Sequence, residues 1–184
     1  MNLHLQAGGT LNPRQHVYVE RTEDETLFRL LMEGQYVNVL TSRQMGKSSL
    51  MIRAVYRLGQ QGVRCVTIDL ASELGSPSDL NTYYLGLLTK IVHVLRFELD
   101  LKTWWNERNT ETVNQRLLSF FREIVAGRIS EPVVIFLDEI DSTLKLPYTD
   151  DLFTAIRGMY NERPIVDAYR RVTFACSASR PRTS

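Results

Sequence analysis

The feature that most constrains this chain is a short polar loop between an apolar run and a helical pattern. The apolar run is residues 36–40 (YVNVL), the loop is residues 41–49 (TSRQMGKSS), and the helical pattern is residues 50–58 (LMIRAVYRL). Backbone N–H groups in such a loop and in the first helical turn have no partner inside the helix, so they can bind a phosphate group. Gly46 favours a tight turn because it has no Cβ atom. The stretch is therefore predicted to bind phosphate.

The loop matches the P-loop pattern G-x-x-x-x-G-K-[ST] except at its first position, where Thr41 replaces glycine. The threonine restricts the backbone but leaves the phosphate-facing amides in place. We expect Lys47 to reach the β- and γ-phosphates of a nucleotide and the Ser48 hydroxyl to bind Mg²⁺. The predicted nucleotide-binding residues of the loop are Gln44, Met45, Gly46, Lys47, Ser48 and Ser49. A chance Gly-Lys-Ser sequence at the start of an ordinary helix is the alternative interpretation.

A second motif is an apolar run that ends in carboxylates, residues 131–141 (EPVVIFLDEID). An unbroken apolar run is typical of a strand that is buried on both faces of a parallel sheet. Asp138 is then expected at the carboxyl end of the strand, where open α/β sheets bind ligands. We predict that Asp138 holds Mg²⁺ through water and that Glu139 orients the attacking water as a catalytic residue beside Lys47. An isolated Asp-Glu pair would favour a solvated loop, but the upstream Gly-Lys-Ser favours a nucleotide site.

The composition indicates one globular domain. The chain has 184 residues, of which 43% are hydrophobic and 23% are charged. A formal net charge of +1 argues against a general attraction to nucleic acid or to an anionic membrane. The sequence has no apolar run of membrane-spanning length and no basic-then-apolar leader, so we expect a cytoplasmic protein without a membrane partner. Its cysteines and histidines have no metal-ligand spacing.

Strand and helix patterns alternate along the chain. Strands are predicted at residues 36–40, 63–70, 133–137 and 171–177, and helices at 22–31, 50–58, 80–97, 112–126 and 151–161. Thr22 with Glu25, and Thr112 with Gln115, fit capping boxes. The alternation predicts an α/β fold with a parallel sheet and helices on both faces.

Two adjacent tryptophans, Trp104 and Trp105, lie between the third and fourth predicted helices. Adjacent residues cannot share one helix face, so we expect one tryptophan in the core and the other at an edge or a partner surface. Packing is favoured over ligand binding for both.

The order of the elements resembles one class of P-loop ATPase. A complete strand–helix unit, residues 63–127, lies between the P-loop helix and the acidic strand, and a glutamate directly follows Asp138. This is similar to the additional-strand, catalytic-glutamate class that includes AAA+ and STAND proteins. The resemblance implies a P-loop NTPase three-layer sandwich in which the fourth strand inserts between the acidic strand and the P-loop strand. The absence of an Asn-Lys-x-Asp motif argues against a GTPase.

A closer resemblance covers residues 8–175. Six segments are similar to the AAA-like domain found mainly in cyanobacterial multidomain proteins, which often carry WD repeats or other signalling modules: 8–11 (GGTL), 18–21 (YVER), 43–50 (RQMGKSSL), 103–105 (TWW), 134–141 (VIFLDEID) and 169–175 (YRRVTFA). The resemblance implies a loose lead-in at residues 1–15 and an AAA-like ATPase domain at residues 16–184. It also implies that this domain is incomplete after its fourth core strand, because a fifth strand and a lid would follow.

The resemblance also suggests roles for residues outside the loop. It places Tyr18 and Arg21 against the adenine, although packing for Tyr18 and a surface charge for Arg21 are the alternatives. It implies that the last strand presents a polar sensor to the γ-phosphate, with Ser177, Ser179 and Arg180 as candidates. An arginine finger is not assigned among Arg157, Arg163, Arg170 and Arg171, for each of which a surface role is favoured.

The implied strand order bears on the two cysteines. Cys65 and Cys176 would lie on strands two places apart, at a separation of about 9 to 10 Å. That separation exceeds the reach of a disulfide, so both are expected to be free thiols.

The sequence therefore predicts a domain that binds Mg-ATP and hydrolyses it slowly as a signalling switch, attached to or partnered by signalling or repeat domains and able to oligomerise. One alternative is a nucleotide-dependent interaction module that does not hydrolyse ATP. The weaker alternative is a nucleic-acid-remodelling ATPase with a local basic patch at Arg170 and Arg171. The missing lid affects hydrolysis more than binding, because lids normally complete such sites.

Overall fold

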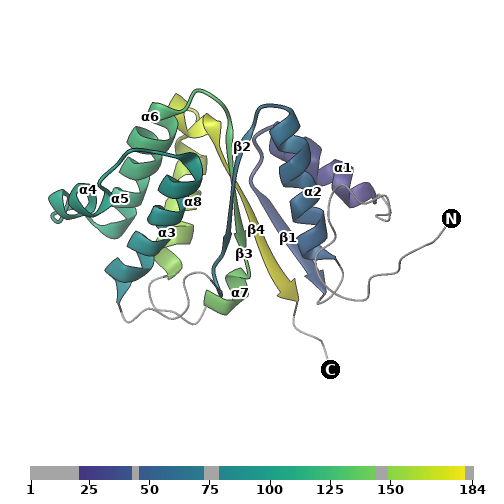
Figure 1. The fold of residues 1–184 in the computed structure, drawn as a ribbon, viewed down its shortest axis with the longest axis horizontal. Coiled ribbons are helices and arrows are strands. Elements are labelled where there is room, and N and C mark those ends of the chain that lie inside the picture. The colour runs from purple at the N-terminus through teal and green to yellow at the C-terminus, as the bar shows by residue number, and fades with distance from the viewer. Residues whose placement is uncertain (1–20, 43–45, 73–78, 144–148, 181–184) are drawn as a thin grey trace.

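A parallel four-stranded sheet separates two layers of helices in the computed structural model, which describes residues 21–42, 46–72, 79–143 and 149–180 (Figure 1). The strands are β1 (Val37–Ser42), β2 (Arg64–Asp69), β3 (Val133–Asp138) and β4 (Val172–Arg180). Their spatial order is β1-β4-β3-β2, and every pairing is parallel. The three-layer α/β fold and the insertion of the fourth strand between the acidic strand and the P-loop strand are therefore confirmed.

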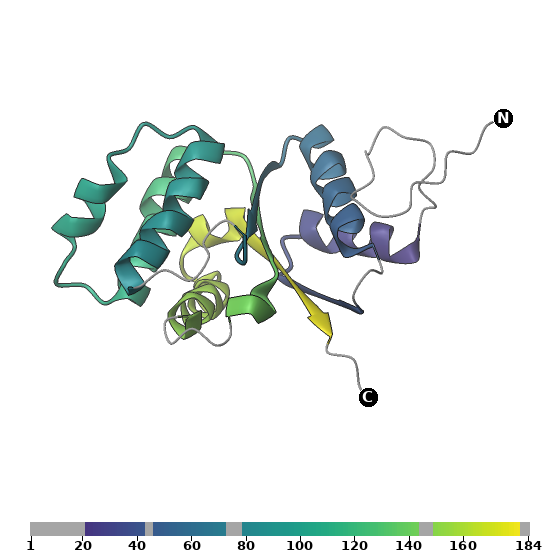
Figure 2. The same ribbon diagram turned by 60° about the horizontal axis from the view of Figure 1, so that its bottom comes forward.

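The two helical layers differ in size. Helices α1 (Thr22–Met32) and α2 (Lys47–Gln60) cover one face of the sheet. The other face carries α3 (Leu80–Leu95), α5 (Val113–Ser119), α6 (Ala126–Arg128) and α8 (Thr149–Glu162), as Figures 1 and 2 show. The shorter elements are α4 (Leu101–Glu107), the π-helix η1 (Phe120–Val125), α7 (Ile140–Thr143) and the 3-10 helix η2 (Asp167–Arg171).

The unbroken apolar run of β3 lies in the middle of the structure. Each residue from Val133 to Leu137 is at most 1% exposed. Alternate side chains of the strand enter two separate cores, with Ile135 facing the α3/α8 side and Phe136 facing the α1/α2 side. This confirms a strand buried on both faces, which is why its sequence does not alternate with polar residues.

The two predicted capping boxes have different outcomes. Thr112 is confirmed as an N-cap, since its Oγ1 accepts from Gln115 N at 3.2 Å and Gln115 Oε1 accepts from Thr112 N at 2.8 Å. The box predicted for Thr22 and Glu25 is wrong, because the helix begins one residue earlier. Arg21 is the N-cap of α1, and its backbone N–H donates to Asp24 Oδ2 at 2.8 Å.

The prediction that only one tryptophan is buried is wrong. Trp104 is 8% exposed and Trp105 is 1% exposed, because α4 packs between α3 and the π-helix and therefore buries two of its faces. Trp105 stacks on Tyr84 and donates from Nε1 to Asn81 Oδ1 at 3.1 Å, and Trp104 meets Phe120 edge-on. Both tryptophans serve packing, as expected.

Both cysteines are free, as the strand order implied. Cys65 lies on β2 and Cys176 on β4, so β3 separates them. Burial raises the pKa of the Cys65 thiol to about 12 and that of the Cys176 thiol to about 11. Both groups therefore remain protonated thiols near neutral pH and react slowly.

Arg163 connects the C-terminal end of α8 to the amino-terminal ends of the strands by hydrogen bonds. Its guanidinium donates to the carbonyl oxygens of Gly34, Tyr169 and Val172. It also lies 4.3 Å from the ring centroid of Tyr36. A half-buried cation with several carbonyl acceptors and an aromatic face is a strong structural contact.

Replacing Arg163 by methionine should lower the free energy of unfolding by about 2 to 4 kcal/mol, because the variant loses charge-assisted hydrogen bonds and leaves carbonyl groups unpaired. Urea unfolding monitored by circular dichroism measures this change. The matched control is Arg29→Met, which removes an exposed pair with Glu33 and should change stability by about 0.5 kcal/mol or less. Equal effects of the two substitutions would contradict the structural role of Arg163.

Candidate functional site

The candidate site lies at the carboxyl ends of the strands, where α2 begins. Helix α2 follows β1 and opens with Lys47, and β3 ends at Asp138. Strand β4 lies between β1 and β3 and brings Ser177 to the same end of the sheet. The fold thus gathers three segments that are far apart in the sequence. This end of a parallel sheet is where α/β proteins bind ligands.

Gly46 starts α2 in a conformation that glycine adopts most readily. Its φ is 78° and its ψ is 22°, in the left-handed region. An ideal Cβ at this position would lie 3.4 Å from Nη2 of Arg21. Gly46 offers no side-chain cap, and the first turn of α2 contains no acidic residue. The positive end of the helix dipole is therefore not neutralised by a carboxylate of its own first turn, which suits an anionic ligand.

Lys47 is a buried cation held by two carboxylates. It is 8% exposed, and its Nζ lies 2.8 Å from Asp138 Oδ1 and 2.7 Å from Glu139 Oε1. Burial by itself lowers the pKa of Lys47, but its hydrogen bonds to both carboxylates and their negative charges outweigh burial and raise the pKa. The ammonium group is consequently charged at neutral pH.

One carboxylate oxygen of Asp138 accepts hydrogen bonds from three donors. Its Oδ1 accepts from Lys47 Nζ, from the Ser177 hydroxyl, and from the backbone N–H of Glu139 at 2.8 Å. Ser177 is 1% exposed, so its hydroxyl is buried against the carboxylate. Among the three sensor candidates, Ser177 is thus the one placed in the site, and the side chains of Ser179 and Arg180 lie outside the described residues.

Glu139 has a strained backbone. Its φ of 55° is in the left-handed region, which costs a residue with a Cβ about 1 to 3 kcal/mol. Its carbonyl accepts from the Ser142 N–H at 3.0 Å and from the Ser142 hydroxyl at 2.6 Å, at the start of α7. The side chain is 37% exposed and reaches Lys47 from the solvent side. Strain of this kind is concentrated at functional sites.

Sequence analysis missed Asp69. This residue ends β2 and is the register partner of Asp138 on β3. Burial opposes ionisation of its carboxyl group, but hydrogen bonds from Ser72 and Ala71 and the charge of Lys47 lower its pKa. Asp69 therefore adds a negative charge beside Asp138. An acidic residue at the carboxyl end of a predicted strand was the signal that could have identified it.

The other predicted site residues are placed in different ways. Ser48 is exposed in the first turn of α2, and Ser49 is buried. The guanidinium group of Arg21 lies against Gly46. The predicted positions Tyr18, Gln44 and Met45 lie outside the described residues.

Most of the arginines considered for a finger are far from the site. The guanidinium groups of Arg163, Arg170 and Arg171 contact carbonyl oxygens near the amino-terminal ends of the strands. Arg157 lies on α8, where it lines a groove on the sheet.

Ser48 and Asp138 offer hydroxyl and carboxylate oxygens, which are ligands that Mg²⁺ prefers. Within the described residues, no group of three or more histidine, cysteine or acidic side chains could hold a metal ion. A Mg²⁺ ion at this site would therefore take further oxygen ligands from water or from a bound phosphate, which is the usual arrangement for this ion.

Comparison with known proteins identifies the domain. The sequence pattern of the AAA-like domain family matches residues 6–181. An uncharacterised WD repeat-containing protein of Synechocystis sp. (strain ATCC 27184 / PCC 6803 / Kazusa) is 40% identical over 174 residues, which make up 92% of this chain and 14% of that protein. The chain therefore spans only a small part of its longer relative.

Solved structures with the same fold include an ORC2 protein and a Walker-type ATPase. The Aeropyrum pernix ORC2 protein in ADPNP-ADP complexes has a TM-score of 0.61 and 20% identity, over 88% of this chain and 41% of that chain. Its ADP form has a TM-score of 0.56 and 20% identity, over 95% of this chain and 43% of that chain. A Walker-type ATPase of Pyrococcus abyssi has a TM-score of 0.51 and 16% identity, over 91% of this chain and 47% of that chain. The chain thus spans less than half the length of each of these structures.

The described helices include none that combines the length and the apolar character needed to span a membrane.

Lys47→Met should lower the free energy of unfolding by about 1 to 3 kcal/mol at neutral pH, because it leaves Asp138 and Glu139 side by side without a counter-charge. Adding Glu139→Gln should recover part of this loss, since it removes one of the two unpaired charges. Urea unfolding of both single variants and the double variant measures the coupling, with the exposed Lys102→Met as the control. Strictly additive effects would contradict the ion cluster.

Proposed function

Because the chain belongs to the AAA-like domain family, we propose that it binds Mg-ATP and hydrolyses it slowly as a switch for attached domains. The observation that carries this proposal is the position of Lys47. It stands at the start of α2 and directly contacts both carboxylates at the end of β3. A phosphate-binding helix terminus, a lysine and paired carboxylates are the groups that phosphoryl transfer requires.

The phosphates are proposed to bind at the amino terminus of α2. The N–H groups of the first turn and the ammonium group of Lys47 provide positive charge, and Gly46 lets a phosphate approach the backbone closely. The amides of Gln44 and Met45 and the first-turn residues Ser48 and Ser49 complete the proposed loop contacts. Arg21 adds a positive charge beside Gly46, and with Tyr18 it is proposed to approach the adenine.

Ser48 and Asp138 are the residues proposed to hold Mg²⁺, whose role when bound is to stabilise negative charge on the phosphates. Ser177 positions the Asp138 carboxylate by hydrogen bonding to it. Asp69 keeps this end of the sheet negative, which favours a divalent cation over a monovalent one.

Glu139 is the proposed general base. It would accept a proton from water as the water oxygen attacks the γ-phosphorus, while the bond from that phosphorus to the bridging oxygen breaks and ADP leaves. In the structure, the Glu139 carboxylate pairs with Lys47 at 2.7 Å. A triphosphate that binds Lys47 in place of Glu139 would free the Glu139 carboxylate to accept a proton from water. Binding of the substrate and activation of the base are thereby linked.

Attached domains are proposed as the target of the switch. The Synechocystis relative is named as a WD repeat-containing protein, and this chain matches 14% of it. We propose that the present domain likewise acts beside repeat or other signalling domains. The cytoplasm, where ATP and Mg²⁺ are abundant, is the compartment that this activity requires.

Calorimetric titration with ATP and ADP in the presence of Mg²⁺ tests binding. Lys47→Ala should weaken ATP binding by about a hundredfold or more, because it removes the main phosphate cation. Lys102→Ala, which changes an exposed lysine on α4, should bind as tightly as the unmodified chain. Equal affinity of both variants for ATP would contradict the proposed site.

The alternative is a nucleotide-dependent interaction module that binds but does not turn over. The direct pairing of Glu139 with Lys47 favours this alternative, since it engages the carboxylate that would otherwise accept a proton from water. Phosphate release under multiple-turnover conditions separates the two functions. If the domain is an ATPase, Glu139→Gln should reduce turnover by about a hundredfold and retain ATP binding. Tight binding without turnover in the unmodified chain would support the interaction module, and unchanged turnover in Glu139→Gln would exclude Glu139 as the base.

A further inference from the structure

Both main-chain polar groups of Glu139 are held by hydrogen bonds. Its N–H donates to Asp138 Oδ1 at 2.8 Å. Its carbonyl accepts from the Ser142 N–H at 3.0 Å and from the Ser142 hydroxyl at 2.6 Å. The two peptide groups that flank the Cα atom of Glu139 are therefore fixed, and so is the direction in which its side chain leaves the backbone. That direction leads to Lys47, whose Nζ lies 2.7 Å from the Glu139 carboxylate.

The left-handed conformation of Glu139 needs such contacts. A residue with a Cβ atom stays in this region only when its surroundings hold it there. Among the described residues, the other non-glycine residue with positive φ is Arg96, which is the C-cap of α3. Left-handed residues are common at that end of a helix. Glu139 instead precedes a helix, so its conformation depends on the specific bonds that its carbonyl accepts.

The Ser142 hydroxyl makes more than an ordinary helical contact. Serines in helices often hydrogen bond to a carbonyl three or four residues earlier without a functional role. Here the side chain of Ser142 is exposed, so water could satisfy its hydroxyl and the bond is not needed to avoid a buried unpaired group. The acceptor is also the carbonyl of the strained residue that contacts Lys47. The bond therefore bears directly on the position of a carboxylate in the candidate site.

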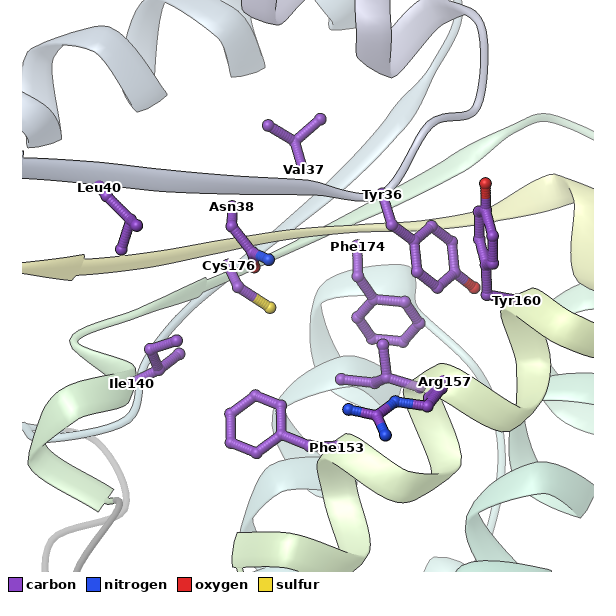
Figure 3. A pocket seen from close by; sticks show the side chains of 11 residues that line it. Tyr36, Val37, Asn38, Leu40, Ile140, Phe153, Arg157, Tyr160, Phe174 and Cys176 are labelled. Atoms are coloured by element: carbon purple, nitrogen blue, oxygen red, sulfur yellow. The ribbon is translucent and has the colours of Figure 1, made fainter.

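Helix α7 gives Ser142 a firm base. The Thr143 hydroxyl donates to the Ile140 carbonyl at 2.9 Å, and the hydroxyl of Thr149, the first residue of α8, donates to the Thr143 carbonyl at 2.6 Å. Both threonines are 1% exposed. Ile140 packs against the larger core and lines the groove between β1 and α8 (Figure 3). Because α7 is anchored to the core and to α8, Ser142 can restrain Glu139.

We propose that Ser142 is a positioning residue for Glu139. Its hydroxyl holds the Glu139 backbone in the left-handed conformation and thereby keeps the carboxylate beside Lys47. The same bond directs the carboxylate toward the attacking water once a nucleotide has replaced it at Lys47. This second role rests on the proposed function, in which Glu139 is the general base, whereas the first role does not. Ser142 acts through Glu139 and is assigned no contact with the nucleotide.

Nuclear magnetic resonance of the lysine ammonium groups in ¹⁵N-labelled protein tests the first role. The signal that is missing from Lys47→Met identifies Lys47. Ser142→Ala should shift this signal toward its position in Glu139→Gln, because the ammonium group loses its fixed carboxylate partner in both variants. Ser142→Thr should leave the signal unchanged, since a threonine hydroxyl can donate to the same carbonyl.

The matched control for this spectrum is Ser130→Ala. It removes an exposed hydroxyl that donates to the Glu131 carboxylate at 2.9 Å, before the start of β3 and therefore at the opposite end of that strand from Glu139. The Lys47 signal should not move in this variant. A Lys47 signal that is the same in Ser142→Ala as in the unmodified chain would overturn the proposal.

Steady-state phosphate release with ATP and Mg²⁺ tests the second role. Ser142→Ala should lower kcat about tenfold without raising KM, because the base is less well directed while Lys47 remains free to bind phosphate. Ser142→Thr should restore most of the lost kcat, and Ser130→Ala should match the unmodified chain. An unchanged kcat in Ser142→Ala, or a loss that appears only as a higher KM, would contradict this role.

The two measurements separate failure of this inference from failure of the proposed function. An unmodified chain that releases no phosphate would contradict the ATPase function and, with it, the second role of Ser142. The lysine spectrum would still decide whether Ser142 holds Glu139 beside Lys47. Urea unfolding of Ser142→Ala and Ser130→Ala should give similar stabilities, because both lost hydroxyls are exposed. A change in kcat between these two variants then reports on position and not on unfolding.

Discussion

The ion cluster of Lys47 with Asp138 and Glu139 is the interaction on which the arrangement of this domain depends. A buried ammonium group is very unfavourable unless carboxylates and hydrogen bonds compensate it. Lys47 is the first residue of α2, and the carboxylates follow β3, so the start of one element must meet the end of another across β4. Ser177 occupies the intervening strand and hydrogen bonds to the same carboxylate. The order of the strands therefore brings these residues together, and the contacts among the residues in turn stabilise that order.

The same cluster compensates the positive charge of Lys47 at the start of α2. The paired carboxylates neutralise Lys47, and under the proposed function a phosphate would replace them. Glu139 is strained in the left-handed region while it makes this contact. The proposed exchange of partners at Lys47 would give the domain two arrangements, which is the minimum that a nucleotide switch needs.

Much of this architecture could be predicted because its signals are local. The predicted phosphate loop and the apolar run of β3 have distinctive patterns, and their pairing indicated the candidate site, whereas the strand order came from the resemblance to a known class. Features that depend on tertiary contacts between distant parts of the sequence could not be predicted. Both tryptophans are buried because α4 is enclosed on two sides. The role of Asp69 depends on its register with Asp138, and the contact between Lys47 and Glu139 depends on a backbone conformation that no sequence pattern specifies.

The most direct test of this account is a pair of crystal structures of the chain, one without nucleotide and one with Mg²⁺ and a non-hydrolysable ATP analogue. We predict that Lys47 Nζ leaves Glu139 in the second structure and contacts the phosphates, while Asp138 stays bonded to Ser177. A second structure in which Lys47 keeps both carboxylates at ion-pair distance and the analogue is bound elsewhere would contradict the proposed site.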